Sequence, residues 1–475
     1  MTARHLRDAL DWALREHHDR LAVGSLTHQM TYRELDVASA STAREIAARG
    51  WRRVALKAAS SPRYVVSLLA VLRAGAVPFL VDPALSPDES GKLAESCGFD
   101  AAITDGDDAG PDLTIQPLTR SGPVPDLLPD TEVCRFSSGS TRTPGCIEFS
   151  GSAVRNAAAA WTEASGLHAD DVILCFAGLY NGLAFNTSLI PGLLAGASLW
   201  LPRGLPSASH VQRYVATVRP SILVGFPALY DGLARRAGGR PPLTGIRIAL
   251  SSAAQLSVDT ARTVAEHDGV RIADYYGIAE TGPLTFDPDS RPGGGQGALL
   301  PGVEVRVVSP NGLGAEDGEL EVRSRSMGSR YLNYPGEMER RITVDGFYRT
   351  GDEGLVADGR LRLTGRSGRR FNIGGRKVSA EEIMDVIRMH PAVRDCVVLE
   401  VTNQSDAAVI AAAVVADGAL TVEEVRRFCL SRMAAFKVPE RIAFTDRIPR
   451  SGAGKPLAVA LHALFTETRA AGGDR

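Results

Sequence analysis

Residues 135–145 read Arg-Phe-Ser-Ser-Gly-Ser-Thr-Arg-Thr-Pro-Gly, with a dense alternation of hydroxyl side chains and glycine. The segment lies between an apolar strand and a region expected to be helical. Its backbone N–H groups and hydroxyls are suited to phosphate oxygens, so we predict a phosphate loop from Ser137 to Thr143. It is not a Walker loop, because no Gly-Lys-Ser/Thr follows at the required spacing. Taken alone, it also fits a plain Ser/Thr/Gly linker.

Around this loop, short β-branched runs alternate with amphipathic segments. Strands are expected at 54–57, 77–81, 101–104, 172–176, 222–225 and 246–251, and helices at 64–74 and 152–165. Residues 105–131 and 286–299 are rich in Gly, Pro and Asp and predict loops. The alternation predicts an α/β fold, with a large N-terminal domain of parallel-rich sheets covered by helices.

The rhythm changes towards the C-terminus. Expected strands at 304–308, 318–323, 346–350 and 360–364 are separated by turn residues and predict a small β-rich subdomain. A helix at 380–390, strands at 395–401 and 409–415 and a helix at 422–433 follow. This mixture spans about a hundred residues, the size of a separate small α+β domain.

Bulk composition excludes several classes of function. The chain has 475 residues and a formal net charge of −2, so no global field favours nucleic acid or an anionic membrane. No run of about 20 uninterrupted apolar residues predicts a membrane span. Met1–Leu14 reads as an amphipathic helix without the apolar core of a signal peptide, which favours the cytoplasm. The six cysteines and nine histidines lack metal-ligand spacing, so no structural metal is expected.

Four further motifs follow the loop in chain order. Tyr275-Tyr276-Gly277-Ile278-Ala279-Glu280 places a carboxylate after a strand and turn, and Tyr348-Arg349-Thr350-Gly351-Asp352 places an aspartate in a turn. Gly365-Arg366 comes next, and Ser451-Gly452-Ala453-Gly454-Lys455 places a lysine in a loop near the end. Each motif alone has a simple structural explanation, but the ordered set is much more specific.

With these motifs the sequence resembles the adenylate-forming superfamily, which includes acyl- and aryl-CoA synthetases, adenylation domains of peptide synthetases, and luciferases. The similarity covers nearly the whole chain. Beyond the motifs above, it rests on Thr31-Tyr32-Arg33-Glu34-Leu35, Leu72-Arg73-Ala74-Gly75-Ala76-Val77-Pro78, Gly318-Glu319-Leu320, Tyr331-Leu332, Gly374-Gly375-Arg376-Lys377-Val378 and Ile448-Pro449-Arg450-Ser451-Gly452.

The resemblance implies ATP-dependent activation of a carboxylic acid to an acyl-adenylate, followed by transfer of the acyl group to a nucleophile. It implies an N-terminal domain at 1–366 and a mobile C-terminal domain at 367–475 that swings about a hinge after Arg366. Lys455 would bridge the acid and the phosphate in the first step, and Gly374 and Gly375 would line the thiol tunnel in the second. The ATP-binding residues would be Ser137, Ser138, Gly139, Ser140, Thr141, Arg142, Tyr276, Gly277, Ala279, Asp352 and Arg366, with Mg²⁺ on Glu280 and Thr141.

Several positions depart from the family pattern. The loop has Arg142 and Gly145 where the family has glycine and lysine; Arg142 is one candidate to replace the missing cation, and whether it does so is left open. Ala279 replaces a threonine, Gly368 replaces the usual hinge Asp or Lys, and Ser252-Ala253 replaces a glycine-rich pair. These departures leave open a second class, a non-catalytic or weakly active relative that binds nucleotide.

The acid pocket is expected at Tyr180, Asn181, Gly182, Phe185, Phe226, Ser251 and Ser252. Amino-acid-activating relatives carry a Phe-Asp pair where this chain has Phe176-Ala177, so an aryl or short acyl acid is favoured over an α-amino acid. No carrier domain follows Lys455, so the expected acceptor is CoA or a separate carrier protein, in a setting such as natural-product biosynthesis. Amino-acid adenylation and amide formation remain alternatives.

Overall fold

The computed structural model describes residues 5–105, 113–119, 122–137, 143–204, 207–252, 256, 258–288, 295–309, 312–313, 318–366, 370–373, 376–403, 407–449 and 458–466. The chain forms two compact units. The first comprises Met1–Pro83, Glu95–Ser137 and Gly145–Ser367, and the second comprises Ala84–Ala94, Ser138–Pro144 and Gly368–Arg475. Helix α4 (Pro87–Cys97) contains the boundary between Ala94 and Glu95.

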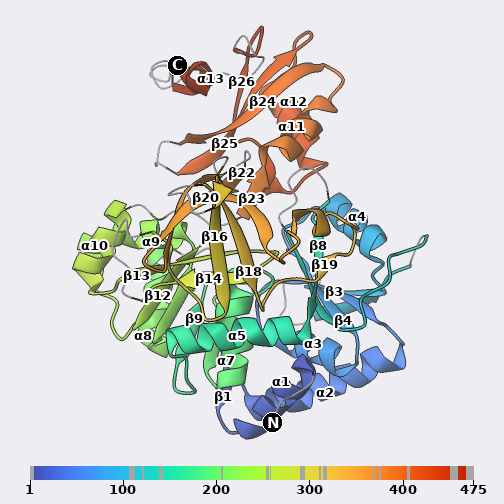
Figure 1. Ribbon diagram of the computed structural model, residues 1–475, viewed down its shortest axis with the longest axis vertical. Helices are drawn as coiled ribbons and strands as arrows, with labels where there is room; N and C mark the ends of the chain where they lie inside the picture. The colour runs from blue at the N-terminus through green and yellow to red at the C-terminus, as the bar shows by residue number, and fades with distance from the viewer. Residues whose placement is uncertain are drawn as a thin grey trace. The chain divides into compact units, whose positions relative to one another are not determined.

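A large mixed sheet organises the first unit (Figure 1). Its described strands, in spatial order, are β17 (Gly312–Leu313), β16 (Val303–Ser309), β18 (Gly318–Ser324), β20 (Tyr348–Ala357), β21 (Arg360–Arg366), β15 (Gly297–Leu299), β14 (Gly282–Phe286), β13 (Ile272–Ile278), β12 (Ile248–Ser252), β11 (Ile222–Gly225), β9 (Val172–Cys175), β10 (Ser198–Trp200), β1 (Leu21–Gly24) and β2 (Gln29–Thr31). Strands β13, β12, β11, β9, β10 and β1 run parallel, which confirms the predicted α/β class.

A second sheet in the same unit contains the two strands that flank the predicted phosphate loop in the sequence. Its described strands are β19 (Arg330–Tyr331), β8 (Cys146–Ser150), β7 (Thr131–Phe136), β4 (Val77–Leu80), β3 (Arg53–Lys57), β5 (Ala101–Asp105) and β6 (Leu113–Pro117). Strands β7 and β8 pair antiparallel, with Phe136 opposite Cys146. The backbone N–H of Ser137 donates to the carbonyl oxygen of Gly145 at 2.8 Å, which closes the base of the loop.

Helices cover both faces of the parallel strands, as buried strands require. In β9, Ile173 and Cys175 contribute to one apolar core, whereas Leu174 contributes to the core on the opposite face. The helical segments of this unit are α1 (Leu6–Glu16), α2 (Tyr32–Ala48), α3 (Pro62–Arg73), α5 (Gly151–Ser165), α6 (Gly182–Ala184), the π-helix η1 (Phe185–Leu189), α7 (Ile190–Ala195), α8 (Ala208–Val218), α9 (Pro227–Ala234), η2 (Ala237–Gly239), α10 (Val258–Asp268) and η3 (Glu339–Arg341).

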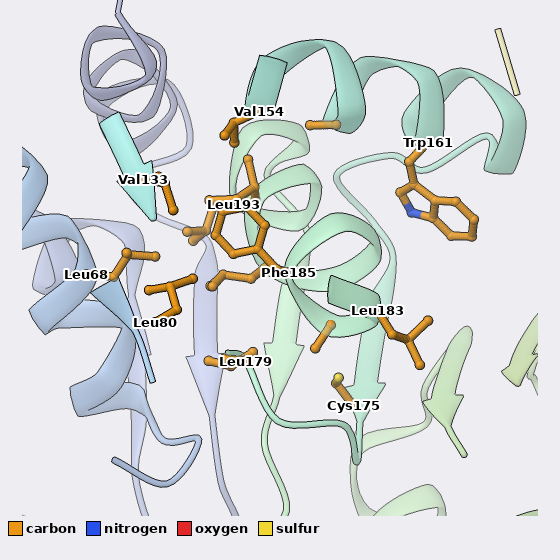
Figure 2. Close-up of a cluster of buried hydrophobic side chains, with 14 of the residues drawn as sticks. Leu68, Leu80, Val133, Val154, Trp161, Cys175, Leu179, Leu183, Phe185 and Leu193 are labelled. Atoms are coloured by element: carbon orange, nitrogen blue, oxygen red, sulfur yellow. The ribbon is translucent and has the colours of Figure 1, made fainter. Parts of the chain in front are cut away.

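The larger core joins the two sheets through these helices. In Figure 2, Phe185 and Leu193 point towards Val133, which lies on β7. The early Thr-Tyr-x-Glu-Leu motif has a structural role here: Thr31 and Glu34 form a capping box that starts α2. Tyr32, the next residue, is buried and donates to the carbonyl oxygen of Ala197 at 2.8 Å. Among the described helices, none is long and apolar enough to cross a membrane.

The second unit has its own core. Its described elements are β22 (Arg370–Ile373), β23 (Arg376–Ser379), α11 (Ala380–Arg388), β24 (Val393–Thr402), β25 (Ala408–Ala416), α12 (Val422–Leu430), η4 (Ala435–Lys437), β26 (Arg441–Phe444) and α13 (Ala458–Thr466). Strands β24 and β25 form a long antiparallel pair, and β26 joins β25 in parallel. Helix α11 packs on β24 (Figure 1).

The structure corrects four local expectations. The segment after the phosphate loop is the strand β8, and helix α5 begins only at Gly151. Residues 113–117 pair with β5 as an edge strand, although the composition of 105–131 predicted a loop. Residues 297–299 form β15, within a segment also expected to be a loop. Asp352 lies within β20 instead of in a turn. The β-rich segment at 304–364 continues the large sheet, because β21 pairs with β15.

Candidate functional site

The parallel strands place several predicted pocket residues along one edge of the sheet. Gly225 and Ser251 stand side by side at the carboxyl-terminal ends of β11 and β12, and Asp274, near the start of β13, is the register partner of Ser251. Phe226 follows β11 directly and precedes α9, and Ser252 ends β12. Ligands of open α/β sheets bind outside the carboxyl ends of the strands. This edge is therefore the candidate acid and nucleotide site.

One polar side chain at this edge is buried and another, beside it in the sheet, is half-buried. Ser251 is fully buried, and its hydroxyl has no hydrogen-bond partner among the described residues. Burial raises the pKa of the Asp274 carboxyl on the neighbouring strand to about 6. Buried polar groups are normally satisfied, so an unpaired hydroxyl indicates a place where a ligand or water completes the bonding.

The nucleotide side of the site contains a buried hydrogen bond between two strands. The phenol of Tyr276 on β13 donates to Oδ2 of Asp352 on β20 at 2.6 Å. Both side chains are buried. The backbone N–H of Asp352 donates to Oγ1 of Thr350 at 3.0 Å, which holds the backbone from which the Asp352 side chain extends. Arg366 is the residue opposite Asp352 on β21. The structure thus brings together the predicted Tyr276 and Asp352.

Glu280 lies in the turn between β13 and β14. The turn is tight: a Cβ at Gly277 would lie 2.5 Å from the carbonyl oxygen of Gly282, so only glycine fits there. Tyr331, on β19 of the other sheet, donates its phenol proton to the Glu280 carboxylate. Burial and then the charge of Glu280 raise the pKa of the Tyr331 phenol, which keeps it a donor. Glu280 is therefore held by a side chain from the second sheet.

Tyr331 also explains the unusual glycine of the phosphate loop. A Cβ at Gly145 would lie 2.5 Å from Cε1 of Tyr331 and 2.8 Å from Oγ of Ser137. These distances are shorter than real Cβ contacts, so any side chain at 145 requires Tyr331 to move. The space beside residue 145 is taken by the tyrosine that binds Glu280.

Arg135, near the end of β7, lies next to the turn that contains Glu280. Its Nη1 donates to Oδ1 of Asn186 at 3.2 Å, and its Nη2 donates to the carbonyl oxygen of Ala279 at 3.3 Å. The guanidinium carbon lies 4.4 Å from the ring centroid of Phe149 and 5.2 Å from that of Phe185. Burial lowers the pKa of Arg135 to about 10, so it remains charged at neutral pH.

Some residues of the predicted acid-pocket segment 180–186 stabilise the fold instead of lining a pocket. The Oδ1 of Asn181 accepts the backbone N–H of Leu183 at 2.9 Å and caps α6. Phe185 is buried in the core and contacts Arg135. Tyr180 is half-buried, and its ring occupies the space that a side chain at Gly178 would need. Tyr180, Asn181 and Gly182 are the half-buried members of the segment, whereas residues 183–186 are buried.

Several predicted residues lie outside the described parts of the chain: Ser138, Gly139, Ser140, Thr141, Arg142, Gly374, Gly375 and Lys455. The side chain of Arg366 lies outside them too. Sequence reasoning missed Arg135 and Asn186 as site residues, and it named Tyr331 only as part of a motif. Tyr348 and Arg341 also lie near Glu280. Burial opposes the charge of Arg341, but Tyr348, Glu280 and Tyr331 outweigh it and raise the pKa of Arg341.

Curated relatives match almost the whole chain. The 4-chlorobenzoate–CoA ligase of an Arthrobacter species is 28% identical, over 90% of this chain and 88% of its own length. Triostin synthetase I of Streptomyces triostinicus is 31% identical, over 97% of this chain and 94% of the matched protein. Both are proteins to which this chain is similar over nearly its whole length.

Solved structures share the fold. A malonyl-CoA ligase with methylmalonyl-CoA and AMP bound is 26% identical, covers 91% of this chain and 97% of its own, and has a TM-score of 0.79. The o-succinylbenzoate CoA synthetase of Bacillus subtilis is 20% identical, with a TM-score of 0.84 over 96% of this chain and 98% of its own. The latter likeness concerns the fold alone.

Family models account for both parts of the sequence. The model described as AMP-binding enzyme matches residues 10–332, and the model described as AMP-binding enzyme C-terminal domain matches residues 382–455. The first match covers the phosphate-loop segment, the candidate acid edge, Glu280 and Tyr331. These matches confirm the predicted resemblance and the class of AMP-forming, acid-activating ligases. The chain belongs to the family of AMP-binding enzymes.

Proposed function

We propose that this chain activates an aryl or short acyl carboxylic acid with ATP and passes the acyl group to the thiol of CoA or of a separate carrier protein. The observation that carries the proposal is the pair of buried carboxylates, Asp352 and Glu280. Each accepts a hydrogen bond from a tyrosine, and Tyr276 and Glu280 are only four residues apart. A nucleotide can thus meet one carboxylate at its ribose and the other near its phosphates.

The nucleotide is held by residues on both sides of Tyr276. Asp352 accepts hydrogen bonds from the ribose hydroxyls, and Tyr276 orients that carboxylate. Ser137, the described first residue of the loop, presents its hydroxyl at the base of the phosphate site. The remaining phosphate donors of the proposal are the hydroxyls and amides of 138–142. Phosphoryl chemistry depends mainly on such positioning and on charge neutralisation.

Glu280 suits Mg²⁺, a hard cation that takes oxygen ligands. No group of three His, Cys, Asp or Glu gathers within the described residues, so the remaining ligands of the ion are expected from Thr141, the phosphates and water. When bound, Mg²⁺ supplies neutralisation of phosphate charge. Tyr331 positions the Glu280 carboxylate for this role by holding one of its oxygens.

The acid pocket supports a substrate without an α-amine. The residue after Phe176 is Ala177, whose methyl side chain offers no carboxylate to an ammonium group. Tyr180 supplies an aromatic surface, and Ser251 supplies a hydroxyl for a polar substituent. The names of relatives such as 4-chlorobenzoate–CoA ligase and 4-coumarate–CoA ligase support an aryl acid.

The second step belongs to the C-terminal part of the chain in this proposal. Residues 1–366 and 367–475 act as two domains, and Lys455 serves acid activation whereas Gly374 and Gly375 line the path of the thiol. The proposal places the enzyme in the cytoplasm. Triostin synthetase I among the relatives supports carrier loading in natural-product biosynthesis as one setting.

The test is pyrophosphate release with MgATP across a panel of benzoates, cinnamates, short acyl acids and amino acids. It is followed by mass spectrometry of products formed with CoA, with carrier proteins and with amines. Release with an aryl or short acyl acid and a thioester product supports the proposal. Binding of ATP without release from any acid indicates a nucleotide-binding relative, and an amide without a thioester indicates an amide-forming enzyme. Either result overturns it.

A further inference from the structure

The buried cation Arg135 has no assigned role in acid activation, and its environment is unusual. It is 4% exposed, and no described carboxylate lies within ion-pair distance of its guanidinium. By contrast, the buried Arg240 pairs with Asp268 at 2.5 Å, with both side chains almost fully buried. A buried charge without a partner is strongly destabilising, whereas an apolar side chain of similar size is not. Retaining a charge here therefore suggests a use for it.

The contacts of Arg135 within the protein offset only part of the cost of burying its charge. The guanidinium has five N–H donors, and the two hydrogen bonds it makes, at 3.2 Å and 3.3 Å, are long for charge-assisted bonds. The rings of Phe149 and Phe185 add favourable cation–π contacts. Neither ring nor carbonyl carries a formal negative charge, and the Glu280 carboxylate attracts the guanidinium only from beyond ion-pair distance. The positive charge is therefore partly balanced and can still attract anions that bind nearby.

Arg135 lies close to three segments that the proposed reaction uses. It lies two residues before Ser137, where the phosphate loop begins. One nitrogen holds Asn186 at the end of the acid-pocket segment, and another holds the carbonyl of Ala279, directly before Glu280. A Cβ at Gly182 would lie 3.6 Å from its Nη1, so the cation also borders the half-buried part of that segment.

The position of the usual loop lysine cannot supply this charge. Gly145 stands there, and Tyr331 and Ser137 occupy the space beside it. In a low-dielectric interior a fixed charge acts over several ångströms with little screening. A cation on β7 can therefore stabilise bound phosphate without touching it.

We propose that Arg135 is a positioning residue whose fixed charge favours the anionic nucleotide in place of the missing loop lysine, while its two hydrogen bonds align Asn186 and Ala279. This inference rests on the proposed function. It differs from a purely structural role in one respect: the charge matters for a phosphorylated ligand and not for a neutral one.

The test compares binding of MgATP and of adenosine, which carries no phosphate, by isothermal titration. Arg135→Met keeps length and packing but removes the charge, and is expected to weaken MgATP at least ~10-fold while adenosine changes less than about twofold. Arg135→Lys restores the charge and is expected to recover MgATP affinity to within about fivefold. The Tm of ligand-free Arg135→Met is expected to equal or exceed that of the wild type, because an unpaired buried charge is removed.

Controls separate the alternatives. Arg240→Met breaks a structural ion pair and is expected to lower the Tm sharply, with both affinities of the folded protein unchanged. Arg341→Met removes the competing exposed cation near Glu280; if it, and not Arg135→Met, causes the selective loss for MgATP, the inference is overturned. Equal affinities in Arg135→Met and wild type, or equal losses for both ligands, also overturn it. If Arg135→Met does not fold, Arg135→Gln repeats the comparison. A wild type that binds no MgATP overturns the proposed function itself.

Discussion

The phenol of Tyr276 donates a hydrogen bond to the carboxylate of Asp352 at 2.6 Å, across 76 residues of chain. Tyr276 comes from the parallel half of the large sheet and Asp352 from its antiparallel half. The bond therefore ties the two halves together at the point where the nucleotide is proposed to bind. It also sets the direction of the Asp352 carboxylate.

The first prediction concerns this bond. Tyr276→Phe keeps the ring but removes a donor to a buried carboxylate, a loss of about 1.5–3 kcal/mol. We expect MgATP affinity to fall ~10–100-fold in isothermal titration, with a smaller change in kcat. Tyr230→Phe is the matched control, because the Tyr230 phenol donates to the carbonyl of Leu250 at 2.8 Å within the core. It should lower the Tm only. Unchanged ATP affinity in Tyr276→Phe would show that Tyr276 does not orient Asp352 for nucleotide binding.

A second prediction tests the space beside the phosphate loop. Gly145→Lys restores the family residue, yet its Cβ would meet Tyr331 at 2.5 Å. We expect Tyr331 to move away from Glu280, with pyrophosphate release at least ~10-fold lower and a reduced Tm. Gly232→Lys, on α9 with nothing within 4 Å of its Cβ, is the control and should retain both. Faster pyrophosphate release in Gly145→Lys would contradict the view that Tyr331 excludes a side chain at position 145.

The third prediction is a pH dependence of stability. Burial raises the pKa of Asp274 to about 6 in the folded state, above its usual value near 4. The folded state therefore holds the proton more tightly, and stability falls as pH rises from about 4 to about 6. Asp274→Asn removes this loss, so it should be more stable than the wild type at pH 7, by about 2–3 kcal/mol at most.

Denaturation midpoints measured between pH 4 and pH 8 check this prediction. The advantage of Asp274→Asn should shrink towards zero near pH 4. Asp259→Asn on α10, whose carboxylate is largely exposed, should show little pH-dependent difference from the wild type. A constant difference at every pH would mean that protonation of Asp274 is not its cause.

The fourth prediction addresses the acid pocket. Gly178→Ala places a Cβ 2.3 Å from Cε1 of Tyr180, so the tyrosine ring must shift. We expect the KM for an aryl acid to rise ~10-fold and the ranking of ring-substituted benzoates to change, with the KM for ATP within about twofold. Gly238→Ala meets nothing within 4 Å and serves as control. Parallel changes in both KM values would argue against Tyr180 as part of the acid pocket.

A fifth prediction separates the two half-reactions. Lys455→Ala should abolish acyl-adenylate formation, because the proposed bridge between carboxylate and phosphate is lost. It should spare thioester formation from an acyl-adenylate supplied in the assay, measured by mass spectrometry. Arg447→Ala, at an exposed position outside the proposed site, is the control for a local loss of charge. Equal loss of both steps in Lys455→Ala would count against a C-terminal domain that swings to use different residues in the two steps.

Much of the fold follows from local patterns in the chain. The alternation of apolar runs predicted β3, β9, β11, β12, α3 and α5 within one or two residues at most ends, because hydrophobic period and turn residues are properties of neighbouring positions. The ordered motifs predicted the adenylate-forming family for the same reason. Edge strands such as β6 escaped detection, because a short, half-exposed strand lacks an apolar pattern.

The partners within the site depended on tertiary structure. Tyr331 and Glu280 come from different sheets, and Arg135 meets Ala279 across 144 residues. No periodicity or spacing encodes such pairs, since they depend on strand order and register. The same holds for Gly145, whose missing side chain makes sense only beside Tyr331. Local chemistry in the sequence was enough to identify the elements and the family; three-dimensional packing selected which of those side chains meet, because contact energies between distant residues exist only once the sheets have assembled.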